Sequence, residues 1–188
     1  MPDPGHPIPR LVPEEPFPAY AYVPGKSPHP TRNAAHRGSD KPHASPAPLD
    51  PDHWRECRPY VRGIDLFNHG YYWEAHEAWE SLWHASGRRG PVAEFLKGLI
   101  ALAAAGVKAR EGRAGGVKQH AQRARSIFEP MKVQPASGPT PRFLGLELRT
   151  LIDNSTRIAE MPEKVLNTAD CSVAIVFEFQ LRLEPSAS

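Results

Sequence analysis

The sequence has little of several features that mark large classes of protein. Its 188 residues include only two cysteines, Cys57 and Cys171, which lie far apart and in no metal-binding spacing. A disulfide framework needs more cysteines in a shorter chain, so we expect a reducing compartment. No run approaches the roughly 20 apolar residues of a membrane span, and residues 1–10 contain no apolar core of a signal peptide. These absences predict a cytoplasmic protein that does not cross a membrane.

An excess of charge of either sign is also missing. Twenty-three Lys and Arg residues against 21 Asp and Glu residues give a formal net charge of +2. Proteins that bind nucleic acid usually carry a strong positive excess. One local basic run, between residues 108 and 125, lacks interleaved aromatic residues, and we interpret it as a solvated helix face. Nucleic-acid binding through the helix after Gly112 therefore ranks last among the functions considered.

Proline, in contrast, is abundant, and most of the 22 prolines precede residue 52. Proline at this density removes backbone donors and fixes φ, so neither helix nor sheet extends. We therefore predict a proline-rich N-terminal arm over residues 1–49, with most of residues 26–49 disordered. Phe17, Tyr20, Tyr22 and Val23 cluster within this arm. Such a cluster on an extended strand is suited to a groove on the domain.

Apolar periodicity predicts an all-α fold for residues 50–160, with its motif core at 59–129. We predict a short helix that follows Asp50 and is interrupted at Pro59, then a hairpin of helices at 60–68 and 71–84 that turns at Gly70. A second hairpin joins helices at 92–110 and 117–129 and turns near Gly112. A further amphipathic helix at 143–160 completes a compact bundle of two helix hairpins plus an extra C-terminal helix.

The C-terminal tail, residues 161–188, changes period. Apolar and polar residues alternate strictly over 177–184, which is typical of a half-buried strand. We therefore expect one β-strand within 173–184, paired with the arm near residues 20–23 or with another subunit. A homo-oligomer formed through this strand or through the arm is the corresponding expectation for partners.

Most of the chemistry lies on the helix predicted at 71–84, within YYWEAHEAWESLW. At 100° per residue, His76, Glu77 and Glu80 project into one broad sector. The helix is apolar on nearly every other side, and such helices are usually central. We therefore expect the carboxylates of Glu77 and Glu80 in or beside the core. Lys97 and Lys108 are interpreted as solvated, with a salt bridge to either carboxylate as the alternative.

Buried carboxylates must be paired, protonated or bound to a cation, so three interpretations remain. In the first, His76, Glu77 and Glu80 form a structural network. In the second, His76 and Glu80 bind a divalent metal from positions i and i+4. In the third, a carboxylate with a raised pKa acts in metal-free acid–base catalysis. Two ligands from one helix do not complete a zinc site. Further ligands would come from Glu74, His69, His84, His120, or from His29, His36 and His43 of the arm.

Two segments resemble a known family. The chain is similar to domain-of-unknown-function family 309 in two segments. The first is GIDLFNHGYYWEAHEAWESLW at 63–83, which resembles the family hallmark FNxGxYxEAHExWExxW. The second is FLKGLIALAAA at 95–105, which resembles the family segment FxQGLIQLA. Lys97 stands where that family commonly has Gln. The resemblance implies an all-helical fold. Because family members are described as metal-dependent hydrolases, it also implies a divalent metal cofactor. By position, Glu74, His76, Glu77 and Glu80 match the polar residues of the motif.

Two functions follow as hypotheses. In a metal-dependent hydrolase, His76 and Glu80 are the metal ligands, and Glu77 or Glu74 is the catalytic base that activates water. The alternative is a non-catalytic helical protein-interaction module, in which the His/Glu group is structural and a groove binds a peptide or subunit. The proline- and aromatic-rich arm favours this second function, because it suits such a groove in cis or in trans. The sequence points to no substrate.

Overall fold

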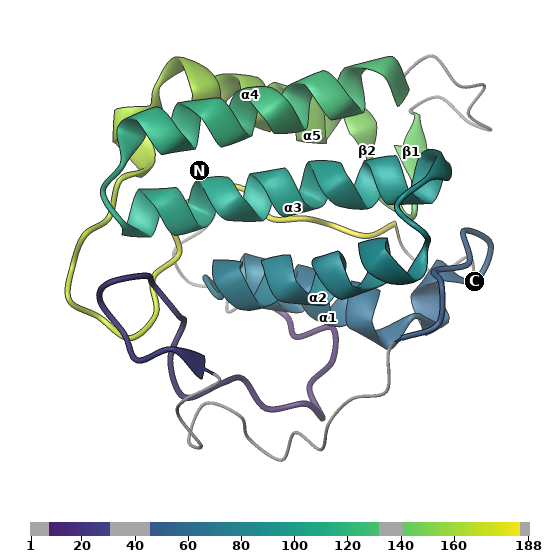
Figure 1. Cartoon of the computed structure of the whole chain (residues 1–188), viewed down its shortest axis with the longest axis horizontal. Helices are drawn as coiled ribbons and strands as arrows, with labels where there is room; N and C mark the ends of the chain where they lie inside the picture. The colour runs from purple at the N-terminus through teal and green to yellow at the C-terminus, as the bar shows by residue number, and fades with distance from the viewer. Residues whose placement is uncertain (1–7, 31–45, 132–140, 185–188) are drawn as a thin grey trace.

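The computed structural model describes residues 8–30, 46–131 and 141–184, and it is built mainly of helices (Figure 1). In chain order the elements are η2 (Trp54–Glu56), α1 (Arg58–Asn68), α2 (Tyr72–Ala85), α3 (Gly90–Arg110), α4 (Ala114–Met131), β1 (Arg142–Phe143), β2 (Leu146–Glu147), α5 (Leu148–Glu160) and η3 (Pro162–Val165). The α1–α2 pair lies on one side of α3, and α4 with α5 lies on the other (Figure 1). The all-α prediction is confirmed.

Both predicted hairpins are present, and each turns at a glycine. Gly70 joins α1 to α2 with φ +87°, and Gly112 joins α3 to α4 with φ +77°. Both values lie in the left-handed region that glycine adopts without steric cost. At Gly70 there is also no room for a side chain, because a Cβ would lie 2.7 Å from the carbonyl oxygen of Ala174.

The central helix, α3, packs closely on both sides because it is rich in small residues. A Cβ at Gly98 would lie 2.4 Å from the ring of Phe128 in α4, and one at Gly106 would lie 2.5 Å from the ring of Tyr72 in α2. By length and composition α3 is apolar enough to cross a membrane, but 61% of its apolar window is buried inside the fold. A buried core helix accounts for that composition without a membrane.

Three local predictions differ from the structure. Instead of a short helix after Asp50, a 3₁₀ turn forms at Trp54–Glu56, and the Asp50 carboxylate accepts a hydrogen bond from the backbone of Asp52 at 2.9 Å. Pro59 does not interrupt a helix but lies in the first turn of α1, where its missing N–H is not needed. The last helix begins at Leu148 rather than 143, because Leu144 and Gly145 have positive φ and turn the chain into the β1–β2 hairpin.

The predicted strand at 173–184 was wrong, since no strand forms in that segment. Apolar side chains do face inward as the alternation predicts, with Phe177 stacked on Phe67 at a centroid distance of 5.6 Å. The backbone, however, bonds to helix side chains: the Tyr72 hydroxyl accepts from the N–H of Val176 at 2.9 Å, and Asn68 exchanges two hydrogen bonds with Leu181. These contacts occupy groups that a strand partner would otherwise bind.

The described part of the arm lies on the helical domain. A backbone hydrogen bond of 2.9 Å from Ala21 to Ser172 links it to the tail, but no strand ladder follows. Leu49 is buried, and so is Pro30. Residues 26–30 and 46–49 therefore lie against the domain, and the disorder predicted for most of 26–49 stays a prediction. Residues 31–45 lie outside the described residues.

Candidate metal centre

The inner face of α2 determines where its polar residues point. Ala75, Trp79 and Leu82 are fully buried, and the indole N–H of Trp79 donates to the backbone carbonyl of Tyr60 at 3.3 Å. These contacts hold the helix in one rotation about its axis. Because residues four apart share a helix face, His76 and Glu80 then project together away from this core.

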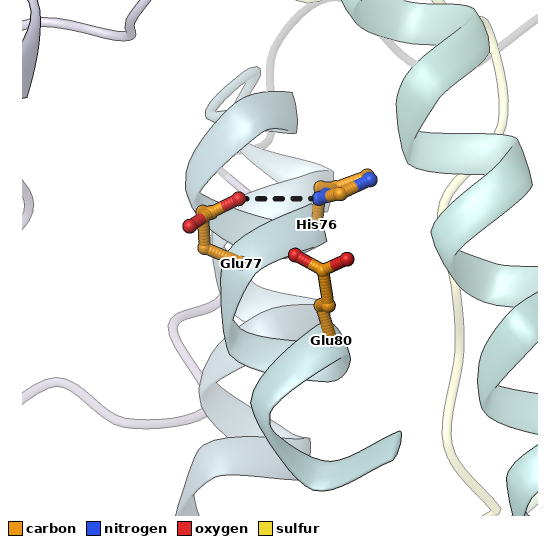
Figure 2. Close-up of side chains that lie close together, drawn as sticks. All are labelled: His76, Glu77 and Glu80. Carbon is orange, nitrogen blue, oxygen red and sulfur yellow. Dashed lines mark ion pairs between the residues drawn. The ribbon is translucent and has the colours of Figure 1, made fainter. Parts of the chain in front are cut away.

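His76, Glu77 and Glu80, here called the His76 cluster, lie together on α2 (Figure 2). One ligand atom from each side chain lies within 4.8 Å of the others. Figure 2 shows Glu77 on the flank of the helix, with its Oε1 3.4 Å from Nδ1 of His76. The cluster thus offers one imidazole nitrogen and two carboxylates to a common point.

We expected both carboxylates in or beside the core; the Glu77 side chain is 47% exposed, while Glu80 is half-buried. The opposite side of α2 packs into the core, so the cluster lies at the edge of the core. The His76 side chain is 25% exposed, but its Nδ1 atom is covered and has no hydrogen-bond partner among the described residues. Oε1 of Glu77 lies within ion-pair distance of this nitrogen but forms no hydrogen bond with it, so the fold leaves the covered nitrogen incompletely satisfied.

These three side chains fit a divalent cation. Ligand bonds of about 2.0–2.2 Å place two ligands of one ion at most about 4.4 Å apart, so the observed spread closes by a small side-chain rotation. Imidazole nitrogen with carboxylate oxygens suits zinc, manganese or iron. The unsatisfied Nδ1 of His76 is the atom that such an ion would bind.

Among the described residues, no lysine or arginine pairs with the carboxylates of the cluster. Lys97 pairs with Glu94 at 3.4 Å and Lys108 with Glu111 at 2.8 Å, each on or next to its own helix. The alternative of a lysine salt bridge to the cluster is therefore wrong. Within the described residues, neither Glu77 nor Glu80 lies within 4.0 Å of a lysine or arginine nitrogen.

Glu74 is directed elsewhere. It is buried, with 8% exposure, and its Oε1 accepts a hydrogen bond from the backbone N–H of Tyr22 at 2.8 Å. Tyr22 also packs edge-on against Trp73, with ring centroids 5.0 Å apart. The structure thus brings together three of the four site residues predicted from the sequence and holds Glu74 against the arm.

The histidines considered as further ligands have other contacts. His69 binds the carbonyl oxygen of Asp65 through Nδ1 at 2.7 Å, and Nδ1 of His84 accepts from Arg88 at 3.0 Å. His29 packs against Tyr22 at 5.0 Å. His36 and His43 lie outside the described residues.

His120 on α4 is the remaining histidine, and it interacts electrostatically with the cluster. Burial lowers the pKa of His120, and the neighbouring Lys108 and Arg123 lower it further. This lowered pKa favours the neutral imidazole, which is the form that binds metals. It is not part of the three-residue group.

Residues 60–119 match the model of a domain of unknown function, DUF309. The similarity to this family covers 60 of the 188 residues. The match begins in α1, ends in α4 and contains the whole His76 cluster. No curated protein sequence matches the chain.

Proposed function

We propose that this chain binds a divalent cation through His76 and Glu80 and uses it in hydrolysis. One observation carries the proposal: the covered Nδ1 of His76 forms no hydrogen bond, while two carboxylates without a lysine or arginine partner among the described residues lie beside it. A structural network would be expected to satisfy that nitrogen. A cation satisfies the nitrogen and the carboxylates together.

Glu77 is the better candidate for the catalytic base. Its carboxylate is exposed to solvent and lies beside the ring of His76, so it reaches a water molecule at the cluster. Glu74 is less suited, because one of its oxygens is held by the backbone of Tyr22. When bound, a divalent cation supplies Lewis acidity and lowers the pKa of a water. Glu77 would then accept the proton of the attacking water.

Metal content tests the proposal. Untagged protein, incubated with Zn²⁺, Mn²⁺ or Fe²⁺ and desalted, is analysed by mass spectrometry beside a His76→Ala, Glu80→Ala variant. We expect near-stoichiometric metal in the parent and none in the variant, with unchanged circular dichroism. Glu77→Gln is expected to keep the metal but to reduce turnover of a responsive ester, phosphoester or amide substrate by about 100-fold. A parent that stays empty in all three metals would contradict the site.

A second function, the protein-interaction module, is favoured by how the arm docks. Arg10 donates to the buried carboxylate of Asp65 at 2.7 Å, and its guanidinium lies 3.6 Å from the ring centroid of Phe17. Phe17 in turn stacks on Tyr71 at 4.8 Å. A surface that binds a proline- and aromatic-rich strand in cis is suited to a similar segment in trans.

Competition tests this second function. The double variant Arg10→Ala, Phe17→Ala removes the main anchors of the arm and is expected to bind a synthetic peptide of residues 8–30 measurably more tightly than the parent does. Calorimetric titration of both proteins with this peptide gives the comparison. Absence of peptide binding to the variant would argue against a peptide-binding surface and leave the metal proposal unaffected.

A further inference from the structure

A second region with a buried polar group that lacks a hydrogen-bond partner lies at the C-terminal end of α3. There the arm between residues 20 and 27, Arg110 of α3 and the loop at 169–172 enclose a cavity of about 260 Å³. In Figure 1 these segments meet beside the α3–α4 turn. No residue of the His76 cluster lines the cavity.

Arg110 is the most unusual residue of this region, because it is a charged group with only 3% exposure. Its Nη2 donates to the carbonyl oxygens of Cys171 at 2.8 Å and Ala169 at 3.4 Å. Its Nη1 donates to the carbonyl and side-chain oxygens of Asn167 at 3.2 and 3.3 Å and lies 3.5 Å from the sulfur of Cys171. All these acceptors are neutral.

The guanidinium therefore keeps an uncompensated charge. Its Nε is covered and has no hydrogen-bond partner, and within the described residues no carboxylate forms an ion pair with Arg110. The negative end of the α3 dipole and the loop carbonyls reduce the cost of this burial, but they carry no full negative charge. A buried charge without a counter-ion is costly, so an anion beside it would be stabilising.

A second cation lines the same cavity. Lys26 of the arm lies on its wall and donates through Nζ to the carbonyl oxygen of Thr168 at 3.1 Å. One carboxylate, Asp170, also lines the cavity, so the two cations exceed the acids by one charge. The hydroxyl-bearing residues Ser27 and Ser172 complete a polar wall.

We propose that this cavity binds a phosphate group, either free phosphate or that of a small organic ester, with Arg110 and Lys26 as its cationic contacts. Phosphate offers more charge and more acceptor oxygens than a carboxylate, which suits two cations and flanking hydroxyls. The volume lies just below the roughly 300–1,000 Å³ of typical small-molecule sites, so the cavity excludes a large ligand. Because the arm and the tail loop both line the cavity, a bound phosphate would contact both segments and stabilise their packing.

Calorimetric titration of the full chain with inorganic phosphate, at constant ionic strength in a phosphate-free buffer, tests this assignment. We expect saturable binding that is at least about tenfold weaker in Lys26→Met. The control Lys118→Met removes an exposed lysine of α4 outside the cavity, and it is expected to bind as the parent does. Arg110→Met should abolish binding; if that variant does not fold, the comparison of Lys26 with Lys118 decides the question.

Two further probes sharpen the result. Phenyl phosphate that binds more tightly than inorganic phosphate would identify an organic ester as the ligand class, and the reverse order would identify free phosphate. Acetate is expected to bind at least about tenfold more weakly than phosphate. The proposal is overturned if the parent binds neither phosphate saturably, if Lys26→Met binds like the parent, or if acetate equals phosphate.

Discussion

The two faces of α2 differ in how many of their buried polar atoms form hydrogen bonds. On the inner face, Trp79 donates its indole N–H to the carbonyl of Tyr60, and the Tyr72 hydroxyl accepts from the tail backbone at Val176. On the outer face, the covered nitrogens of His76 Nδ1 and Trp83 Nε1 have no hydrogen-bond partner within the described residues.

This difference separates the residues that the packing of the core requires from the residues that it does not require. Native proteins pair nearly all their buried polar atoms, so each exception needs an explanation. The inner face is explained by the core alone. The outer face carries an imidazole whose covered Nδ1 forms no hydrogen bond within the described residues, beside two carboxylates, and this is where we place the function. Substitutions on the two faces should therefore behave in opposite ways.

The largest expected effect is on the inner face, for Trp79→Ala. This side chain is fully buried against Phe67 and leaves a large cavity when truncated. We expect the free energy of unfolding to fall by about 3–5 kcal/mol, measured by urea denaturation. Trp73→Ala is the control, because that half-buried ring lies on the arm side of the helix. An equal loss in both variants would contradict the distinction.

A smaller loss is expected for Tyr72→Phe. Without the hydroxyl, the buried N–H of Val176 loses its acceptor, which should lower the free energy of unfolding by about 1–3 kcal/mol at pH 7. The matched change Tyr20→Phe alters a hydroxyl that bonds at the exposed arm surface and should cost less. A neutral Tyr72→Phe variant would show that the tail does not depend on this bond.

Tyr72 also predicts an alkaline pH dependence. Burial raises the pKa of Tyr72 from 10.0 to about 12, so the unfolded chain releases this proton first as the pH rises above 10. The stability of the parent should therefore decrease between pH 10 and 12, and Tyr72→Phe should show less of that decrease. Urea denaturation at pH 9 and 11 measures it. Identical slopes for the two proteins would contradict the raised pKa.

On the outer face, metal-free His76→Ala and Glu80→Gln should change the free energy of unfolding by less than about 0.5 kcal/mol. The reason is that these side chains contribute little packing and no well-formed hydrogen bond. Both variants should, however, lose the rise in melting temperature that metal gives the parent. Differential scanning calorimetry with and without Zn²⁺ measures both effects. A destabilisation comparable to that of Trp79→Ala would favour the structural interpretation of the cluster.

The smallest effect concerns His120, near the outer face. Burial lowers the pKa of His120 below 6.5, so the unfolded chain takes up this proton first as the pH falls. Stability that His120 contributes above pH 6.5 should be lost below it, and His120→Gln should lose less stability than the parent between pH 8 and 5. Urea denaturation at both pH values tests this difference. Equal losses would show that His120 is not desolvated.

Sequence periodicity predicted the helices well because each buries one continuous face. The i,i+4 spacing likewise predicted that His76 and Glu80 share one face of their helix. The exposure of Glu77 was not predictable in the same way. An aromatic helix indicates burial, but which edge remains open depends on how α1 and α3 cover it.

Long-range contacts account for the other differences. The alternation at 177–184 correctly indicated an inward apolar face, but it does not say that Asn68 and Tyr72 bind the backbone instead of a strand. Arg110 appeared to belong to a solvated basic face, yet the loop around Cys171 buries it. A positive φ at Leu144 has no signal of its own, although Gly145 after it favours a turn.

Calorimetric titration of untagged, metal-free protein with Zn²⁺ and Mn²⁺ tests the central claim most directly. The account predicts one ion per chain in the parent, binding abolished in His76→Gln, and binding retained in His84→Gln, which removes a second histidine of the same helix. Equal binding in the parent and His76→Gln, or no saturable binding in the parent, would contradict it and assign the outer face of α2 to structure alone.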